Sequence, residues 1–103
     1  MRTIERSSAF KRDYKRVQAT PRHRKEIEPL LGTVINLLVA DQVLPAKHRD
    51  HLLAGEWLGY RECHIKPDLL MIYRKPDSQT LRLARLGSHS ELFVSVRRNQ
   101  GES

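Results

Sequence analysis

Apolar residues first recur at helical spacing near the start of the chain. Phe10, Tyr14 and Val17 stand at positions i, i+4 and i+7, so they share one side of a helix. Ser7 or Ser8 is expected to cap that helix, because a serine hydroxyl accepts a hydrogen bond from an amide that the helix leaves unpaired. The pattern therefore predicts an amphipathic helix in this region.

A second helical pattern begins after Thr20-Pro21. Pro29 has no amide hydrogen and would kink a helix that ran straight through it, so we expect a fresh start near Glu28, with Pro29 in the first turn. Gly32 weakens this helix without abolishing the pattern. The apolar face of the helix comprises Leu30, Leu31, Val34, Ile35 and Leu38.

The pattern becomes extended beyond Pro45, where the polar connection AKHRDHLLAGEW leads into strands. Three extended segments follow, WLGYRECHI, DLLMIYR and TLRLARL, and the short turns between them favour antiparallel pairing. The middle segment is nearly all apolar, as in a central strand covered on at least one face. With a short edge strand near Ile4, the predicted fold is α/β (α+β), with the order β-α-α-β-β-β.

A chain of 103 residues can form one compact domain but not two ordinary cores. We expect a single domain over residues 1–96 and a flexible polar tail over residues 97–103. The first residues lack the apolar stretch of a secretory signal, and the longest apolar tract is too short to span a bilayer. The single cysteine, Cys63, excludes an internal disulfide and is expected to be a small buried side chain. These features predict a cytoplasmic protein with no membrane partner.

The chain is basic, with 19 lysines and arginines, 12 acidic residues and a formal net charge of +7. Such a charge favours a polyanionic partner, either a nucleic acid or an acidic protein, although a solvated basic surface has the same composition. Four of the cations lie opposite the apolar stripe of the first helix, where phosphate contact and simple solvation are both possible. They are Lys11, Arg12, Lys15 and Arg16.

Candidate chemistry first occurs on the first extended segment, where Glu62 and His64 share one face by period-two alternation. This face could border a reaction site or be the wet side of a half-covered sheet. Asp68 lies just beyond the Lys66-Pro67 bend, which would bring its carboxylate toward His64. The alternative for Asp68 is a turn residue that accepts hydrogen bonds from local backbone amides.

The segment RLGSHSELF, residues 85–93, carries a second group of candidates. Arg85 and His89 have the same strand parity, yet four extended residues would separate them by roughly 13 Å. We expect Gly87-Ser88 to supply a bend, because glycine accepts backbone angles denied to other residues. Otherwise the strand ends in an ordinary polar turn, with Phe93 packed on the core.

The histidines and Asp68 also raise the question of a metal. A zinc site needs converging ligands of fixed geometry, and the cationic Arg49 and Arg85 would repel a metal ion nearby, so we expect neither a metal nor another cofactor. The histidines that raise this question are His48, His51, His64 and His89.

The same residue types suit RNA cleavage without a metal. The ribose 2′-hydroxyl must lose a proton to attack the adjacent phosphate, the phosphorane gathers negative charge, and the departing 5′-oxygen needs a proton. Histidine, with an unperturbed pKa of about 6.5, serves as base or acid near neutral pH. Arginine offers forked, permanently charged donors to a phosphate. The candidates are His51, His64, Asp68, Arg85 and His89.

The ordered motifs DH, G-x-W-x-G-Y-R, H-x-x-x-D and R-x-G-x-H-x-x-L-F run from about Asp50 to Phe93. In this combination the chain resembles the YafQ-type toxins of the RelE superfamily, ribosome-dependent mRNA interferases of bacterial toxin–antitoxin pairs. The resemblance implies a RelE-like fold, with helices packed on a curved, mostly antiparallel sheet. It also implies cleavage of messenger RNA in the ribosomal A site.

The resemblance implies roles for particular residues. His89 would be the general acid and Arg85 the phosphate stabiliser, while Phe93 would hold a nucleotide. The base is left open among three residues that would share proton abstraction and orientation, namely His51, His64 and Asp68. Two positions depart from the family pattern: Glu62, a substrate-binding candidate, replaces an expected aspartate, and Leu69 replaces an expected tryptophan. The second change leaves the codon preference open.

The resemblance further implies a DinJ-like acidic antitoxin as partner, besides the 70S ribosome and its mRNA, with the basic helix faces against ribosomal RNA. Operator DNA would be bound only indirectly, through the antitoxin. A non-catalytic RNA- or ribosome-binding module on the same fold is the main alternative. A sequence-reading DNA regulator is a weaker one, because Pro29 interrupts the only region that resembles a helix-turn-helix.

Overall fold

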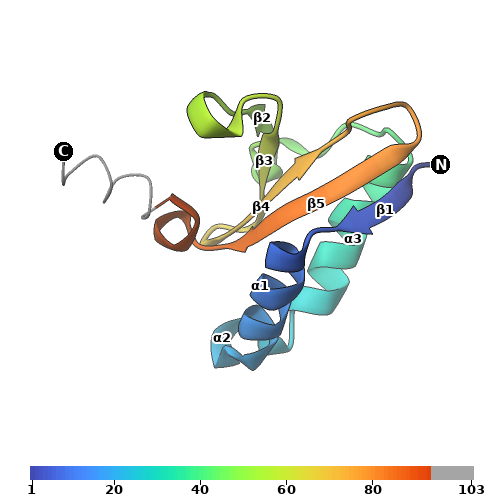
Figure 1. Cartoon of the computed structure of the whole chain (residues 1–103). Coiled ribbons are helices and arrows are strands. Elements are labelled where there is room, and N and C mark those ends of the chain that lie inside the picture. The colour runs from blue at the N-terminus through green and yellow to red at the C-terminus, as the bar shows by residue number, and fades with distance from the viewer. Residues whose placement is uncertain (94–103) are drawn as a thin grey trace, which may run out of the picture.

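The computed structural model describes residues 1–93. Helices occupy the first half of the chain and strands the second, apart from a short first strand (Figure 1). Residues 89–93 are helical after the last strand. The elements are β1 (Thr3–Arg6), α1 (Ser8–Ala19), α2 (Pro21–Arg24), α3 (Ile27–Val39), η1 (Ala46–His48), β2 (His51–Leu52), η2 (Gly55–Trp57), β3 (Arg61–Lys66), β4 (Leu69–Arg74) and β5 (Thr80–Gly87).

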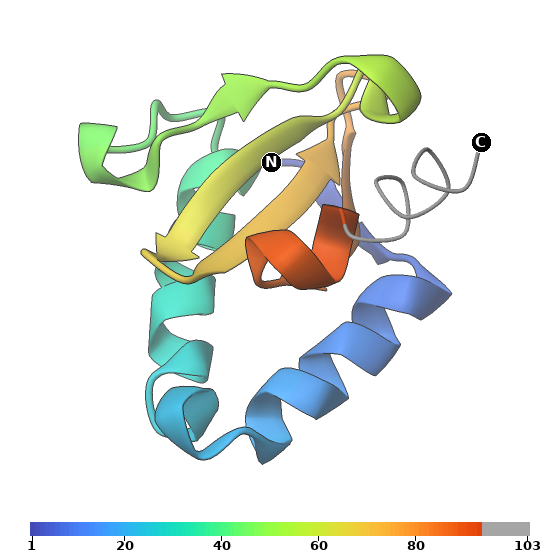
Figure 2. The same cartoon turned by 90° about the vertical axis from the view of Figure 1, so that its left-hand side faces the viewer.

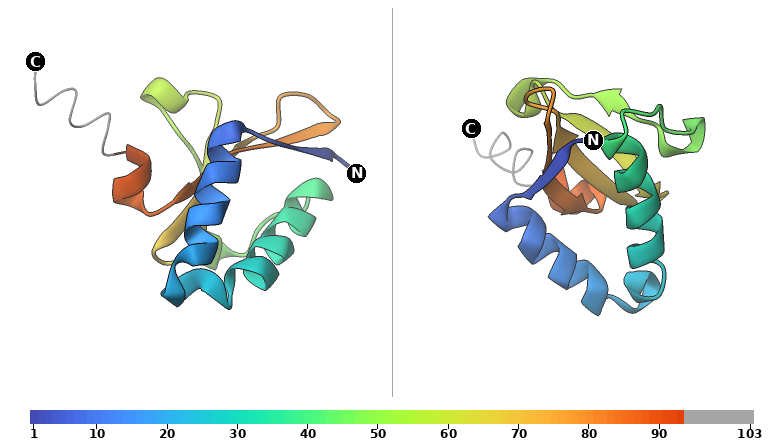
Figure 3. Two further views of the ribbon diagram at one scale, coloured as in Figure 1. Left: turned by 60° about the horizontal axis from the view of Figure 1, so that its bottom comes forward. Right: turned by 90° about the vertical axis from the view of Figure 1, so that its right-hand side faces the viewer.

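The strands form one sheet in the order β1-β5-β4-β3-β2. β1 runs parallel to β5, and the other neighbours are antiparallel. The helices α1 and α3 lie on one side of this sheet and diverge from the short α2 that joins them (Figure 3). The predicted α/β class and the mostly antiparallel sheet are therefore confirmed.

The predicted order of elements lacks the short elements α2, η1, β2 and η2 and the helical residues 89–93. The single turn α2 begins at Pro21, whose fixed φ angle suits the first position of a helix. The strand β2 has only two residues, and it pairs with β3 through His51 opposite Glu62. The extended segment was also expected to begin at Trp57, but Trp57 ends η2 and Gly59 adopts a φ of 92°, so β3 starts at Arg61. The predicted boundary between residues 96 and 97 lies outside the described residues.

The helix predictions hold in detail. Ser7 is the N-cap of α1, and its Oγ accepts a hydrogen bond from the Phe10 amide at 2.9 Å. Phe10 and Val17 are buried in the core. α3 begins at Ile27 with Pro29 in its first turn, where the missing amide hydrogen costs no helical hydrogen bond.

The sheet is covered on both faces, which explains the continuous apolar run of β4. Met71 and Tyr73 belong to the large core beneath α1 and α3, whereas Leu70 and Ile72 belong to a smaller cluster on the other face. Cys63 is fully buried, and this burial raises the pKa of its thiol, as befits a packing residue. No helix within residues 1–93 is long and apolar enough to cross a membrane.

Candidate active site

The sheet register aligns the candidate residues in a row. His51 lies opposite Glu62, Glu62 opposite Ile72, and Ile72 opposite Arg85, so the row crosses β2, β3, β4 and β5. Neighbouring strands are about 4.8 Å apart, so the row spans roughly 14 Å. In the next row, His64 pairs with Leu70 and Leu70 with Gly87.

A cavity of about 380 Å³ lies at the end of the second row. His64 comes from β3, Asp68 from the β3–β4 turn, and His89 from the helical residues after β5. Figures 1 and 2 show that turn close to these helical residues. The fold therefore brings together three of the five predicted catalytic residues. The full lining is His64, Pro67, Asp68, Leu70, Ser88, His89 and Ser90.

A buried carboxylate, Glu62, lies between two of the histidine candidates, His51 and His64. Glu62 is only 5% exposed, and its Oε1 lies 3.6 Å from Nε2 of His51 and 4.0 Å from Nε2 of His64. His51 Nδ1 contacts the carbonyl oxygen of Arg49 at 2.8 Å, and because a carbonyl oxygen only accepts, Nδ1 is the donor. Nε2 of His51 is then the nitrogen that faces Glu62.

Asp50 anchors the chain immediately before His51. The hydroxyl of buried Tyr73 donates to Asp50 Oδ1 at 2.7 Å, and Arg61 Nε donates to the same oxygen at 3.2 Å. Burial and the hydrogen bond to Asp50 raise the pKa of Tyr73, so its hydroxyl stays a donor. A two-residue strand is thus held in place by contacts from β3 and β4.

Asp68 and His48 each make a contact that the sequence did not predict. Asp68 lines the same cavity as His64, but its charged partner is Arg22 of α2, with Oδ2 and Nε 3.6 Å apart. His48 is buried, and its Nδ1 contacts the carbonyl oxygen of His64 at 2.6 Å. His48 therefore supports the backbone of β3 and does not line the cavity.

The chain leaves β5 through a capping box formed by Ser88 and Glu91. Ser88 Oγ accepts from the Glu91 amide at 3.2 Å, and Glu91 Oε1 accepts from the Ser88 amide at 2.8 Å. The helical turn that follows places the His89 ring against Phe93, with centroids 4.8 Å apart and the ring planes tilted by 42°. Phe93 also packs on the smaller core cluster, so it contacts both the core and a candidate residue. The S-x-x-E spacing at residues 88–91, which did not enter the sequence-based predictions, is the pattern that could have predicted this turn.

Gly87 was expected to bend the chain by adopting backbone angles that other residues cannot adopt, and this reason was wrong. Its φ is not in the left-handed region; close packing excludes a side chain instead. A Cβ there would lie 2.8 Å from Nη2 of Arg16, 3.0 Å from Oε1 of Glu91 and 3.3 Å from Cδ2 of Leu92. A bend does occur after this glycine, and the capping box produces it.

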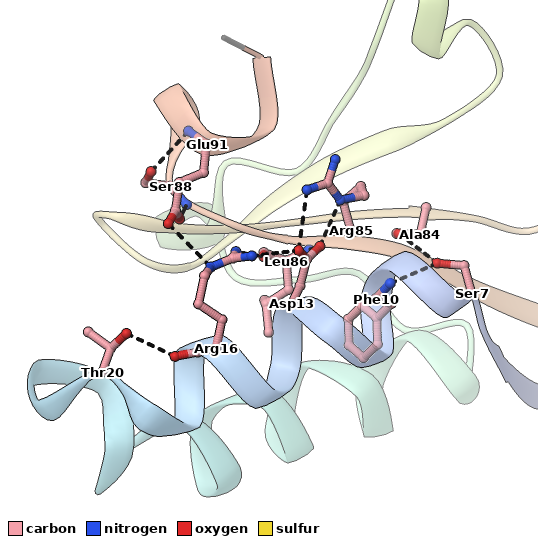
Figure 4. A network of polar contacts seen from close by, with 10 residues as sticks. All are labelled: Ser7, Phe10, Asp13, Arg16, Thr20, Ala84, Arg85, Leu86, Ser88 and Glu91. Carbon is pink, nitrogen blue, oxygen red and sulfur yellow. Dashed lines mark hydrogen bonds and ion pairs between the residues drawn. The ribbon is translucent and has the colours of Figure 1, made fainter. Parts of the chain in front are cut away.

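Sequence reasoning missed Asp13, which is only 3% exposed (Figure 4). Its Oδ2 accepts from Arg85 Nε at 2.7 Å and from the Leu86 amide at 2.9 Å, and its Oδ1 accepts from Arg85 Nη2 at 3.2 Å. Burial alone would raise the pKa of Asp13, but these bonds and one from Arg16 outweigh it, and the pKa is lowered. The hydrogen bonds to Asp13 also raise the pKa of Arg85. The sequence signal that could have revealed Asp13 is its position three residues after Phe10, on an otherwise apolar stripe.

The four cations of α1 are all exposed, but they do not act as one face. Lys11 and Lys15 border a cavity of about 520 Å³ between α1 and α3. Arg16 turns toward β5, where it bonds Asp13 and the carbonyl oxygen of Leu86. The expectation of a single cationic face is corrected, because the buried Asp13 draws Arg16 to one side.

Comparison with known proteins identifies the family. A sequence profile described as "Bacterial toxin of type II toxin-antitoxin system, YafQ" matches residues 2–94. The curated mRNA interferase toxin YafQ of Escherichia coli K12 is 37% identical over 92 residues, which cover 89% of this chain and 96% of that protein.

Solved structures share the fold. A chain of the E. coli DinJ-YafQ complex is 36% identical, with a TM-score of 0.77, and the match covers 90% of this chain and 99% of that one. The metal-bound toxin from Helicobacter pylori is 44% identical, with a TM-score of 0.77, and the match covers 90% and 100%. Fold and profile together define a toxin of a bacterial type II toxin–antitoxin system. The chain belongs to the YafQ family of these toxins.

The Helicobacter relative was solved with a metal bound. Within residues 1–93 of this chain, no group of three or more histidine, cysteine, aspartate or glutamate side chains is arranged to hold a metal ion.

Proposed function

We propose that this chain is an endoribonuclease that cleaves messenger RNA in the ribosomal A site and thereby inhibits translation. The observation that carries the proposal is the cavity shared by His64, Asp68 and His89, which are distant in sequence. The E. coli relative is a curated mRNA interferase, which supports the same substrate class. Such a toxin would act in the cytoplasm, where ribosomes translate.

The proposed chemistry uses side chains alone. One of His51 and His64, oriented by Glu62, takes the proton of the 2′-hydroxyl, and Asp68 borders the same space. Oxygen then attacks the adjacent phosphorus, and the guanidinium of Arg85 stabilises the charge of the phosphorane. His89 gives a proton to the departing 5′-oxygen. Phe93, packed against His89, would hold the neighbouring base by stacking.

The first test is primer extension on messenger RNA bound to translating ribosomes. Wild-type protein should produce cuts at A-site codons, and His89→Ala should slow them roughly 10²–10⁴-fold, because a positioned proton donor is lost. Arg85→Ala should also weaken cleavage. Arg82→Ala is the matched control, since Arg82 lies on the same strand but pairs with exposed Glu5. Intact message with a folded wild-type protein would refute the proposal.

A second candidate function is a non-catalytic module that binds RNA or the ribosome. Leu69, which replaces an expected tryptophan, is only 1% exposed and offers no surface for stacking a base. For such a module, His89→Ala would leave translation inhibition intact. Loss of inhibition in a folded His89→Ala protein that still binds ribosomes would exclude this candidate.

We also propose an acidic, DinJ-like antitoxin as the partner, because a complex of DinJ with YafQ is among the structural relatives. The net charge of +7 favours an acidic partner and fast association with it. Operator DNA would be bound by the complex through the antitoxin.

A further inference from the structure

Among the described residues, the second half of β5 has no strand partner on one edge. β1 pairs only with Thr80 to Leu83, although β5 continues to Gly87. The N-cap residue of α1 and a side chain of its last turn bond β5 beyond the end of β1, because unpaired backbone groups of a buried edge need partners. Ser7 Oγ donates to the carbonyl oxygen of Ala84 at 2.8 Å, and Arg16 Nη2 donates to that of Leu86 at 2.9 Å.

Asp13 bonds both the backbone edge of β5 and the side chain of Arg85 (Figure 4). Pairing the Leu86 amide needs one acceptor, and Asp13 Oδ2 supplies it at 2.9 Å. Both carboxylate oxygens also accept hydrogen bonds from Arg85. Nε donates to Oδ2 at 2.7 Å and Nη2 donates to Oδ1 at 3.2 Å. This forked contact restrains the guanidinium in orientation as well as distance.

One nitrogen of the guanidinium stays available. Within residues 1–93, Nη1 of Arg85 has no hydrogen-bond partner, and the side chain is 27% exposed. Arg16 Nη1 also donates to Asp13, at 2.8 Å, and Arg16 Nε pairs with Oε2 of Glu91 at 3.3 Å. Two arginines thus meet two carboxylates, and this arrangement holds the Arg85 guanidinium in one orientation.

We propose that Asp13 is the positioning residue for Arg85, holding its guanidinium so that the free Nη1 faces the scissile phosphate. This inference rests on the proposed function, in which Arg85 stabilises the phosphorane. A long arginine side chain is otherwise mobile, and a restrained donor needs no reorganisation when charge develops. Asp13 itself does not contact the RNA.

The test is a double-mutant cycle of Asp13→Asn and Arg85→Ala, with cleavage measured under single-turnover and saturating conditions. Asparagine keeps an acceptor for the Leu86 amide but loses the fork, so kcat should fall by up to about 10²-fold while KM does not rise. In the Arg85→Ala background, Asp13→Asn should leave kcat almost unchanged. Glu5→Gln is the matched control, because Glu5 also bonds an arginine of β5, namely Arg82.

Nuclear magnetic resonance gives a readout that does not depend on activity. The Arg85 Nε–H signal of the wild-type protein should be rigid and protected from exchange, and Asp13→Asn should abolish this protection, whereas Glu5→Gln should not. A mobile Arg85 in the wild type overturns the inference even if the variant fails to fold. Equal effects of Asp13→Asn with and without Arg85 would also overturn it, because they indicate a purely structural role. An inactive wild type with a rigid Arg85 counts against the proposed function instead.

Discussion

At the scale of single residues, the carboxylate of Asp13 is shielded from water and still charged. Arg85, Arg16 and the Leu86 amide all donate to it, which offsets the cost of its burial. A buried charge that had lost these donors would be strongly destabilising. Stability should therefore depend on the ionised state of this residue.

The pKa of Asp13 lies below its ordinary value of 3.8, which sets the sign of the pH dependence. Between the folded and the unfolded pKa, the unfolded chain binds more protons, so the contribution of Asp13 is complete above about pH 4 and disappears as pH falls through the folded pKa. Asp13→Asn should lower the free energy of unfolding by about 1–3 kcal/mol at pH 7. The loss should shrink as the pH falls below 3.8, as measured by urea unfolding at several pH values.

Asp41 provides the control for this pH dependence. Hydrogen bonds from Lys75 and Arg2 lower the pKa of Asp41 to about 2, but the residue is exposed. Asp41→Asn should therefore change stability less than Asp13→Asn at pH 7. A larger effect of Asp41→Asn would contradict the importance given to burial.

At the scale of elements, the end of β5 and the turn after it form one unit. Gly87 lets Arg16 and Glu91 approach the strand, and their side chains lie 3.3 Å apart. The capping box of Ser88 then starts the helical turn that carries His89 to the cavity. The position of His89 thus depends on close packing two residues earlier.

Gly87→Ala should disturb this unit. The new Cβ displaces Arg16 from the carbonyl oxygen of Leu86 and crowds Leu92, so the free energy of unfolding should fall by about 1–3 kcal/mol. Cleavage should weaken as well, because His89 shifts. Thermal unfolding and the primer-extension assay measure the two effects.

Gly32→Ala is the matched control, because it makes the same chemical change in the interior of α3. A Cβ at Gly32 meets nothing within 4 Å, so alanine should stabilise the protein by about 0.5–1 kcal/mol through its better helix propensity. Equal stability changes for the two variants would show that packing at Gly87 is not decisive.

At the scale of the whole molecule, the cations in the described part of the chain differ in whether a buried carboxylate holds them. Arg16 and Arg85 are held by Asp13, whereas Lys11 and Lys15 border the cavity between α1 and α3. Free cations near phosphates release counterions on binding, which makes the affinity for RNA depend on salt. The exposed side of α1 is therefore the expected contact with ribosomal RNA.

Lys15→Gln should weaken binding to the 70S ribosome and reduce the slope of log affinity against log salt by about 0.7–0.9, as expected for one lost phosphate contact. Lys47→Gln, which removes the same charge from η1, should leave the slope unchanged. Binding titrations at several salt concentrations measure both slopes. Identical slopes for both variants and the wild type would exclude α1 from the contact.

Much of the fold follows from local patterns in the chain. The stripe of Phe10 and Val17, the serine cap and the position of Pro29 specify the helices, because helix formation depends on neighbours three and four residues apart. The apolar run of β4 indicates a central strand for the same local reason. The two-residue strand β2 was missed, because its pairing depends on Asp50 reaching Tyr73 and Arg61 from distant positions.

The sequence by itself determined the helices, the central strands, the basic charge and which residue types are available for RNA chemistry, because these properties belong to short segments or to composition. Only the tertiary structure decided that His64 and His89 share a cavity and that Glu62 lies between two histidines. It also decided that Asp13, on the buried face of α1, accepts hydrogen bonds from Arg85. These contacts join residues far apart in the chain, and strand register and helix packing set them, which no local pattern specifies.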